Sequence, residues 1–224
     1  MHSFFETIKK CPLFADIQDS DLESLLRCLA ATRHTYSRDA FVFHADDAVE
    51  SVGVVLAGSV HILQEDFWGN RTILAHGGEG DLFGEAFSCA GAERLPVSVM
   101  AVEPAEILLI NYRKIITTCP NSCGFHVTLI RNMLHILARK NMMLTQKLEV
   151  LSMRTTRDKL LAYLSARAVA EQSNRIVIPF SRQELADYLC VDRSALSREL
   201  GKMQREGLLR YDKSRFELMQ QSMQ

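Results

Sequence analysis

The chain has 224 residues, 47% of them hydrophobic and 24% charged, which is enough apolar material for one large core or two small ones. There is no run of eighteen apolar residues, and no basic stretch followed by an apolar core at the N-terminus. We therefore expect neither a membrane span nor a secretory signal, and a cytoplasmic location. Six cysteines without regular spacing do not predict a disulfide framework.

The formal net charge of −1 conceals an asymmetry between the two halves of the chain. Residues 1–111 contain seven Lys and Arg against seventeen Asp and Glu, whereas residues 112–224 contain nineteen against ten. The second half, with its basic excess, is the one suited to a polyanionic partner. Uneven charge on two solvated surfaces is the alternative explanation.

Residues 1–118 are predicted to form an N-terminal sensor domain within an α+β fold. Helical periodicity over 4–30 is interrupted at Pro12, and short apolar runs separated by turn residues follow from Thr35 to Asn111. Many short strands of this kind close into a β-roll, a jelly-roll-like barrel without open edges. The expected strands lie at 41–43, 52–56, 59–63, 72–74, 97–101 and 107–110.

Residues 119–152 are predicted to form one long helix, which begins near Pro120 and has no proline after it. At 1.5 Å per residue, a helix of ~45 Å outreaches a small barrel. Part of it therefore needs a partner, and a parallel second copy in a homodimer is the simplest one. A helix that lies wholly across its own barrel is the alternative. The apolar stripe consists of Ile130, Met133, Leu137, Leu144, Leu148 and Leu151, with Lys140 and Asn141 interrupting it.

Residues 153–224 are predicted to form a winged helix-turn-helix domain. A helix that starts at Thr155 and a short strand ending at Pro179 come first. The apolar face of this first helix is expected to contain Leu160, Leu161, Leu164 and Val169. Ser181 and Glu184 then have the spacing of a capping box at the start of the next helix. Residues 190–192 form the turn, and a second helix runs from Arg193 to Glu206 before Gly207 ends it.

The outward face of the helix that begins at Arg193 is composed of hydrogen-bond donors, most of them cationic. A solvated helix face normally mixes both signs, so this bias is typical of a helix that enters the major groove of DNA. A hairpin with its turn at Lys213 follows and predicts a basic wing for phosphate contacts. A helical hairpin that binds protein is the alternative. The donor face consists of Arg193, Ser194, Ser197, Arg198, Lys202 and Arg205.

The segment FSRQELADYLCVDRSALSREL at 180–200 resembles the winged helix-turn-helix of the CRP/FNR family of transcription regulators. The likeness extends over nearly the whole chain, through KCPLF at 10–14, VVLAGSV at 54–60, GDLFGE at 80–85 and RDKLLAYL at 157–164. It implies a dimeric, sequence-specific regulator that binds double-stranded DNA, responds to an effector and, if it activates, contacts RNA polymerase.

By this resemblance, Arg182 would contact a phosphate, and Arg193 or Arg198 would read a guanine through its O6 and N7 atoms. Ser194 stands where the family commonly has a glutamate, which leaves the operator sequence open. The residues expected to contact DNA are Ser181, Arg182, Gln183, Arg193, Ser194, Ser197, Arg198, Lys202 and Lys213.

The same resemblance bears on the effector. Cyclic-nucleotide-binding relatives have a Gly-Glu pair, here Gly84 and Glu85, followed by Arg-Ser, where this chain has Leu95 and Pro96. Arg94 is one residue away, and such a slip along a strand turns a side chain to the opposite face. A buried phosphate without a cation is costly, so we expect an effector other than cAMP, its identity unknown. A bulge at Arg94 would restore the contact.

An apolar or aromatic small molecule, bound between Phe87, Leu95, Val97 and the long helix around Leu129 and Met133, is the alternative effector. The residues expected to line the effector pocket are Gly84, Glu85, Phe87, Cys89, Arg94, Leu95, Val97, Leu129 and Met133. A small buried residue fits Cys89 better than a redox-sensitive thiol does. The cysteines are too scattered for an iron–sulfur cluster, and the close pair Cys119 and Cys123 is expected to pack around the start of the long helix.

Haem binding through His61, His76 or His126 is conceivable, although lone histidines are more often structural. No metal site or catalytic site is predicted. The competing hypothesis is a small-molecule-binding or enzymatic barrel with an appended helical interaction domain. It would need a nucleophile–base pair or a ligand set inside the roll, and the sequence offers neither.

Overall fold

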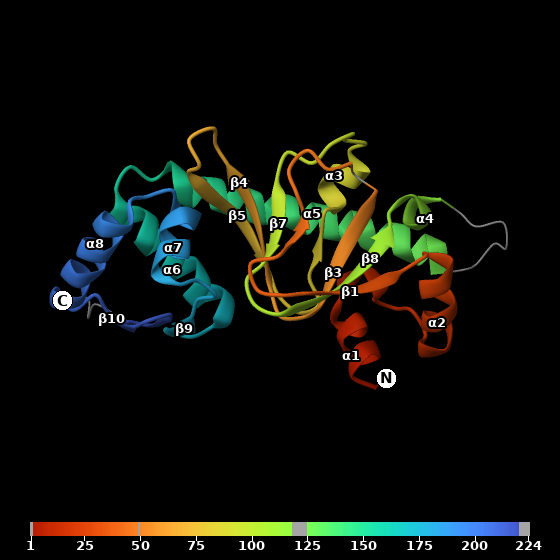
Figure 1. Ribbon diagram of the computed structural model, residues 1–224. Helices are drawn as coiled ribbons and strands as arrows, with labels where there is room; N and C mark the ends of the chain where they lie inside the picture. The colour runs from red at the N-terminus through yellow and green to blue at the C-terminus, as the bar shows by residue number, and fades with distance from the viewer. Residues whose placement is uncertain (1, 49, 118–124, 220–224) are drawn as a thin grey trace. The chain divides into compact units, whose positions relative to one another are not determined.

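A computed structural model describes residues 2–48, 50–117 and 125–219 (Figure 1). The chain separates into two compact units, one of Met1–Asn70 with Leu74–Asn141 and one of Arg71–Ile73 with Met142–Gln224. No helix in the described ranges combines the length and the apolar character that a membrane span requires.

The first unit opens with two helices on either side of Pro12. A one-turn 3₁₀ helix at Pro12–Phe14 separates α1 (His2–Lys10) from α2 (Asp19–Cys28). Proline has no backbone N–H to donate and a fixed φ, so it suits the first position of a new helix but not the interior of one. The predicted interruption at Pro12 is thus confirmed.

The predicted β-roll is confirmed as two four-stranded antiparallel sheets, in the orders β1-β8-β3-β6 and β2-β7-β4-β5 (Figure 1). All six expected strands are present. Two were not predicted: β1 is a largely exposed polar segment, and β6 has two residues. The strands are β1 (Thr32–Tyr36), β2 (Phe41–Phe43), β3 (Ser51–Ala57), β4 (Val60–Glu65), β5 (Arg71–Gly77), β6 (Leu82–Phe83), β7 (Ser98–Ala101) and β8 (Ala105–Asn111).

Close packing in the roll depends on two glycines. A Cβ at Gly53 would lie 2.1 Å from the ring of Phe83, so the aromatic side chain rests on bare backbone. Gly58, between β3 and β4, has φ +76°, and a Cβ there would lie 2.5 Å from the carbonyl oxygen of Pro104. The core around Phe83 consists of Val55, Val60, Phe83, Val99, Ala101, Ala105 and Ile107.

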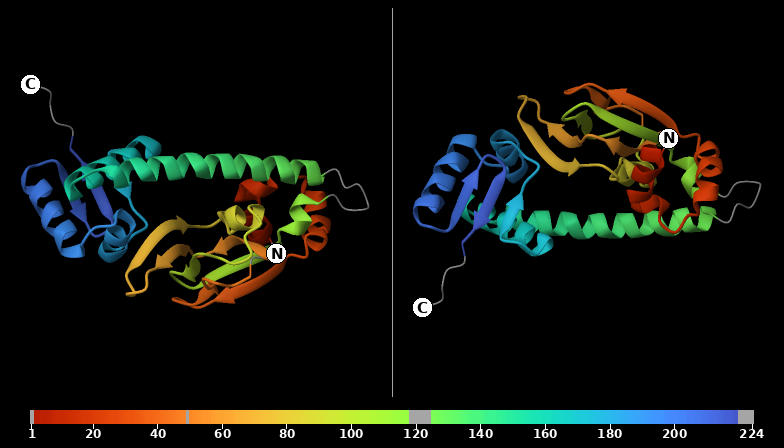
Figure 2. Two further views of the ribbon diagram at one scale, coloured as in Figure 1. Left: turned by 90° about the horizontal axis from the view of Figure 1, so that it is seen from above. Right: turned by 90° about the horizontal axis from the view of Figure 1, so that it is seen from below.

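Helices α3 (Glu85–Cys89) and α4 (Arg113–Ile116) are short, whereas α5 (Phe125–Ser152) is a single continuous helix of 28 residues (Figure 2). Pro120, where we expected α5 to begin, lies outside the described residues. One face of α5 is buried in the first unit through Leu129, Met133 and Ile136, next to Asn132, which donates to the carbonyl oxygens of Leu13 and Ala15. The predicted stripe is only partly internal, because Leu144 and Leu148 are exposed.

The second unit contains the predicted helix-turn-helix and wing. Thr155 caps α6, and a three-stranded sheet in the order β10-β11-β9 supports the helices. Val169 was expected in the apolar face of α6 but is 79% exposed. It follows buried Leu160 by nine residues, which turns it to the opposite side of a helix. The elements are α6 (Thr156–Glu171), β9 (Arg175–Val177), α7 (Arg182–Leu189), α8 (Arg193–Arg205), β10 (Leu209–Asp212) and β11 (Arg215–Leu218).

Candidate DNA interface and sensor site

The capping box predicted at the start of α7 is present. Ser181 Oγ accepts from the Glu184 backbone N–H, and Glu184 Oε2 accepts from the Ser181 backbone N–H at 2.6 Å. Two otherwise unpaired backbone donors are satisfied in this way. Helix α7 then buries Leu185, Ala186 and Leu189 against its neighbours, which fixes the position of α8.

The turn between α7 and α8 depends on Cys190 and Asp192. Cys190 has φ +51°, a left-handed conformation that ends α7. Asp192 Oδ1 accepts from Ser194 Oγ at 2.5 Å and from the Ala195 backbone N–H at 2.9 Å, and these bonds hold the pKa of Asp192 below its usual value. Because its hydroxyl proton is already donated to Asp192, Ser194 offers acceptor lone pairs to a ligand. We had expected it to be a donor.

Helix α8 has a buried apolar face and an exposed cationic face. Leu196, Leu200 and Met203 are fully buried. Glu199 and Glu206, the acidic residues in α8 and at its end, are both paired with Arg157 of α6. Arg157 donates to Glu199 at 3.2 Å and also forms an ion pair with Glu206. The exposed donor face is therefore left to Arg193, Ser194, Ser197, Arg198, Lys202 and Arg205.

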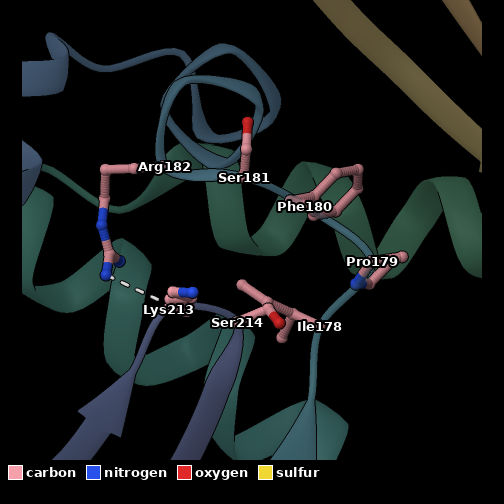
Figure 3. A pocket seen from close by; sticks show the side chains of 7 residues that line it. All are labelled: Ile178, Pro179, Phe180, Ser181, Arg182, Lys213 and Ser214. Carbon is pink, nitrogen blue, oxygen red and sulfur yellow. Dashed lines mark hydrogen bonds between the residues drawn. The ribbon is translucent and has the colours of Figure 1, made fainter. Parts of the chain in front are cut away.

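Arg182 lies between α7 and the wing. Its guanidinium is 4.9 Å from the ring centroid of Tyr211 and 5.8 Å from that of Phe216, and it donates to the carbonyl oxygen of Lys213. Burial lowers the pKa of Arg182 below its ordinary value. The start of α7 and the turn at Lys213 line a hollow of about 450 Å³ that is open to solvent. Figure 3 shows the Arg182 side chain reaching toward Lys213.

The residues expected to contact DNA thus fall on three neighbouring parts of the second unit. Ser181, Arg182 and Gln183 are at the start of α7, and Gln183 donates to Asp187 at 2.7 Å. Lys213 forms the turn of the wing with φ +51°. The remaining residues, Arg193, Ser194, Ser197, Arg198 and Lys202, line one face of α8.

The first unit contains an ion pair that sequence reasoning missed. Gly84, with φ +82°, leads into α3, and the side chain of Glu85 is 3% exposed. Lys140 of α5 places its Nζ 2.8 Å from Glu85 Oε1 and also donates to the carbonyl oxygen of Leu82. Glu85 Oε2 and Ser88 Oγ are buried and have no hydrogen-bond partner within the described part of the chain. The available signal was a lysine interrupting an apolar stripe.

The other expected pocket residues do not all meet. Leu95 and Val97 are buried, and Arg94 is exposed and donates to the carbonyl oxygen of Asp46 at 2.7 Å. Leu129 and Met133 belong to a core cluster with residues of α1 and α2. Among the described residues, that cluster does not include the half-buried Phe87 or the two buried roll residues Leu95 and Val97.

Cys89 is exposed, so our expectation of a small buried residue was wrong; it is the last residue of the short helix α3. The rings of His61 and His76 meet edge to face, with centroids 5.3 Å apart. Over residues 2–48, 50–117 and 125–219, no group of three or more His, Cys, Asp or Glu side chains is arranged to hold a metal ion. Cys119 and Cys123 lie outside these ranges.

Comparison with known proteins agrees with this architecture. Residues 33–121 match the cyclic nucleotide-binding domain and residues 158–221 match the Crp-like helix-turn-helix domain. The "Cyclic AMP receptor protein" of Thermus thermophilus is 26% identical over 206 residues, which cover 91% of this chain and 90% of that protein. The chain belongs to the CRP/FNR family of transcription regulators, with a cyclic nucleotide-binding domain followed by a DNA-binding helix-turn-helix.

Two further relatives are similar over different extents. The "cAMP-activated global transcriptional regulator CRP" of Pasteurella multocida is 32% identical over 81 residues, which span 36% of this chain but only 39% of that protein. The solved structure of the c-di-GMP responsive global regulator CLP of Xanthomonas campestris covers 89% of this chain and is itself covered completely, with 21% identity and a TM-score of 0.72. This likeness shows the fold.

Proposed function

We propose that this protein is a homodimeric, sequence-specific DNA-binding regulator of transcription that responds to an effector other than cAMP. Its sensor domain would comprise residues 1–118, its dimerisation helix 119–152 and its DNA-binding domain 153–224. A regulator of this kind works in the cytoplasm, where it reaches DNA, and contacts RNA polymerase if it activates.

One observation carries the DNA-binding assignment: Arg157 of α6 engages Glu199 and Glu206, and Asp192 is engaged in capping α8, so the exposed donor face of α8 is predominantly cationic. Arg193 and Arg198 are the candidates for bidentate contacts with guanine, and Ser197 and Lys202 extend the same face. Ser181, Gln183, Arg182 and Lys213 would hold phosphates at the start of α7 and at the wing.

The exposed face of α5 supports a parallel homodimer. Val127, Leu134 and Leu148 are 71%, 62% and 68% exposed, and they follow a seven-residue repeat with Asn141 between the last two. A second row with the same repeat lies three residues later, at Ile130, Leu137, Leu144 and Leu151. Two such rows are the a and d positions of a coiled coil, and a single Asn at an a position favours two parallel strands in register.

The sensor site supports an effector that carries hydrogen-bond donors. Glu85 Oε2 is a buried acceptor and Ser88 Oγ is a buried hydroxyl, and each has no protein partner among the described residues. Leu95 is buried where a cAMP site would need a cation, and Arg94 is exposed and bonded to the Asp46 carbonyl oxygen. A negatively charged phosphate at this site would face the Glu85 carboxylate, and Lys140 is already paired with that carboxylate, which argues against cAMP.

The test is selection of duplexes by the purified protein from a random pool, followed by affinity measurements on the winning sequence. We expect a two-fold symmetric site with half-sites about one helical turn (~34 Å) apart. Arg198→Ala should weaken binding about 10- to 100-fold and relax one base position in each half-site. Arg38→Ala, an exposed arginine of the roll, is the matched control. Selection of no sequence, or full affinity in Arg198→Ala, would contradict the proposal.

The identity of the effector is tested in a separate experiment. Thermal unfolding of the full chain is measured in the presence of nucleotides, haem, aromatic acids and oxidants. A ligand that binds only the folded state raises the melting temperature. We expect no shift with cAMP. Stabilisation by cAMP that is lost in Glu85→Gln would overturn this part of the proposal and leave the DNA-binding part standing.

A further inference from the structure

The end of α2 meets the first turn of α5 through a cysteine and a histidine. Figures 1 and 2 both show these two helix ends side by side. His126 Nε2 lies 4.0 Å from Cys28 Sγ, a contact between residues 98 apart in sequence. His126 is 2% exposed, whereas Cys28 is half-buried, so part of the residue is open to solvent. Neither residue belongs to the DNA-contacting surface or to the Glu85–Lys140 pair.

His126 meets the sulfur of Cys28 through Nε2. Nδ1 is buried and has no hydrogen-bond partner within the described residues, so it is unpaired whichever ring nitrogen carries the proton. The proton shared with Cys28 is therefore the one that matters: Nε2 can take it from the thiol and then donate it back to the sulfur. A hydrogen bond donated to sulfur favours the thiolate, and the thiolate is the reactive form of cysteine.

Other cysteines of the described chain have surroundings that disfavour the thiolate or leave it unassisted. Cys11 is fully buried, and burial raises the pKa of its thiol to about 12. Burial, with the nearby Glu85 carboxylate, also raises the pKa of Cys89. Cys190 is exposed, and its thiol donates to the carbonyl oxygen of Asp187.

We propose that Cys28 is a modification site that reacts with peroxides, and that His126 is its positioning partner at the start of α5. The Cys28 sulfur attacks one oxygen of the peroxide and the O–O bond breaks. The thiol proton ends on the leaving oxygen, so hydrogen peroxide yields Cys28 sulfenic acid and one water. Sulfur is oxidised by two electrons and the peroxide is reduced by two.

Oxidation would change the junction of α2 and α5. The added oxygen has to fit between Cys28 and a ring that is 2% exposed. Interiors are close-packed, so the first turn of α5 must shift to accommodate it. The same helix continues to Ser152, beyond the boundary between the two units. This site does not depend on the proposed choice of effector or of operator.

The experiment exposes the full-length protein to excess hydrogen peroxide and follows each cysteine by alkylating the remaining thiols for peptide mass spectrometry. We expect the free thiol of Cys28 to disappear at least 10-fold faster than that of Cys190. His126→Gln should slow the oxidation of Cys28 about 10-fold. His135→Gln changes an exposed histidine of the same helix and should leave the oxidation rate of Cys28 unchanged. Equal rates for Cys28 and Cys190, or an unchanged rate in a folded His126→Gln protein, would overturn the proposal.

A pH profile in the wild-type protein keeps the proposal testable if His126→Gln does not fold. The oxidation rate of Cys28 should reach its half-maximum at a lower pH than that of Cys190. A midpoint at the same or a higher pH would mean that His126 does not favour the thiolate. No DNA is present in either measurement, so failure here is distinct from failure of the regulator assignment.

Discussion

Lys140 Nζ lies 2.8 Å from Glu85 Oε1, and this contact joins the long helix α5 to the short helix α3 of the roll. The two side chains differ in exposure, since Glu85 is 3% exposed and Lys140 is 38% exposed. A buried carboxylate depends on such a partner, because an uncompensated charge in a protein interior is strongly unfavourable. Lys140 therefore supplies the positive charge that compensates the buried Glu85 carboxylate.

Lys140→Met is expected to destabilise the protein by about 2 kcal/mol, less than for a fully buried pair because Lys140 is partly solvated. Urea unfolding measures the change. The double variant Glu85→Gln with Lys140→Met should regain much of the loss, since no charge is then left buried. Arg139→Met, at the neighbouring exposed position, serves as the control. Equal stability of Lys140→Met and wild type would show that the pair contributes nothing.

Arg157→Ala should weaken DNA binding although Arg157 is not on the donor face of α8. Release of Glu199 and Glu206 places two unpaired carboxylates beside that face, and we expect about a 10-fold loss of affinity for every duplex sequence. Fluorescence anisotropy with a labelled duplex measures it. Adding Glu199→Gln and Glu206→Gln should restore affinity. If the triple variant binds no better than Arg157→Ala, the loss has another origin.

Lys213→Ala and Arg193→Ala are expected to impair DNA binding in different ways. Lys213 at the wing turn would contact phosphate, so its loss should weaken binding to all sequences and reduce the slope of log affinity against log salt by about 1. Arg193 would read a base, so its loss should reduce discrimination between the selected and a scrambled duplex. Identical salt slopes for Lys213→Ala and wild type would remove Lys213 from the interface.

Asn141→Leu tests the register of the proposed coiled coil. An Asn in an a layer lowers stability but fixes strand number and alignment, so the apolar variant should melt at a higher temperature and form species larger than a dimer. Sedimentation velocity and thermal unfolding measure both effects. Gln146→Leu, on the outer side of the same helix, should change neither. A wild-type protein that sediments as a monomer at micromolar concentration would refute the dimer.

Lys147 predicts a stability that depends on alkaline pH. Its Nζ donates to the Ile73 carbonyl oxygen at 2.7 Å and lies 3.9 Å from the ring centroid of Tyr188, while burial lowers its pKa from 10.5 to about 8. Between these two pH values the unfolded chain binds more protons than the folded one. The free energy of unfolding therefore rises with pH across that window. Below pH 8 Lys147 is charged in both states, and the destabilisation caused by burying its charge is fully present.

Lys147→Met should consequently be more stable than wild type at pH 7, and this advantage should shrink as the pH approaches 10. Urea unfolding at four pH values between 7 and 10 measures the difference. Lys202→Met, at an exposed position of α8, should show no such trend. A difference that is constant with pH would mean that Lys147 keeps its ordinary pKa.

The helix-turn-helix could be predicted almost residue by residue because its signals are local. The Ser181 and Glu184 capping box, the Asp192 cap and the left-handed Gly207 all act within one helical turn of the boundary they set. The β-roll was predictable from its apolar runs, but β1, a largely exposed polar strand, has no such run.

Contacts between distant segments could not be predicted. Lys140 and Glu85 are 55 residues apart, and nothing in the apolar stripe of α5 indicates which of its faces the roll covers. The same holds for Arg157 with Glu199, which are 42 residues apart. Val169 was misassigned for a simpler reason, since an apolar residue near a helix end was counted with a face that it does not share.

The Arg157 contacts also bear on how quickly the protein finds a duplex. Because Glu199 and Glu206 are paired with Arg157 of α6, the electrostatic potential around α8 is most positive on its exposed donor face. This potential should steer an approaching polyanion toward that face before any base contact forms. The association rate constant should fall steeply with ionic strength. The lifetime of the complex would then depend separately on the proposed contacts of Arg193 and Arg198 with the bases.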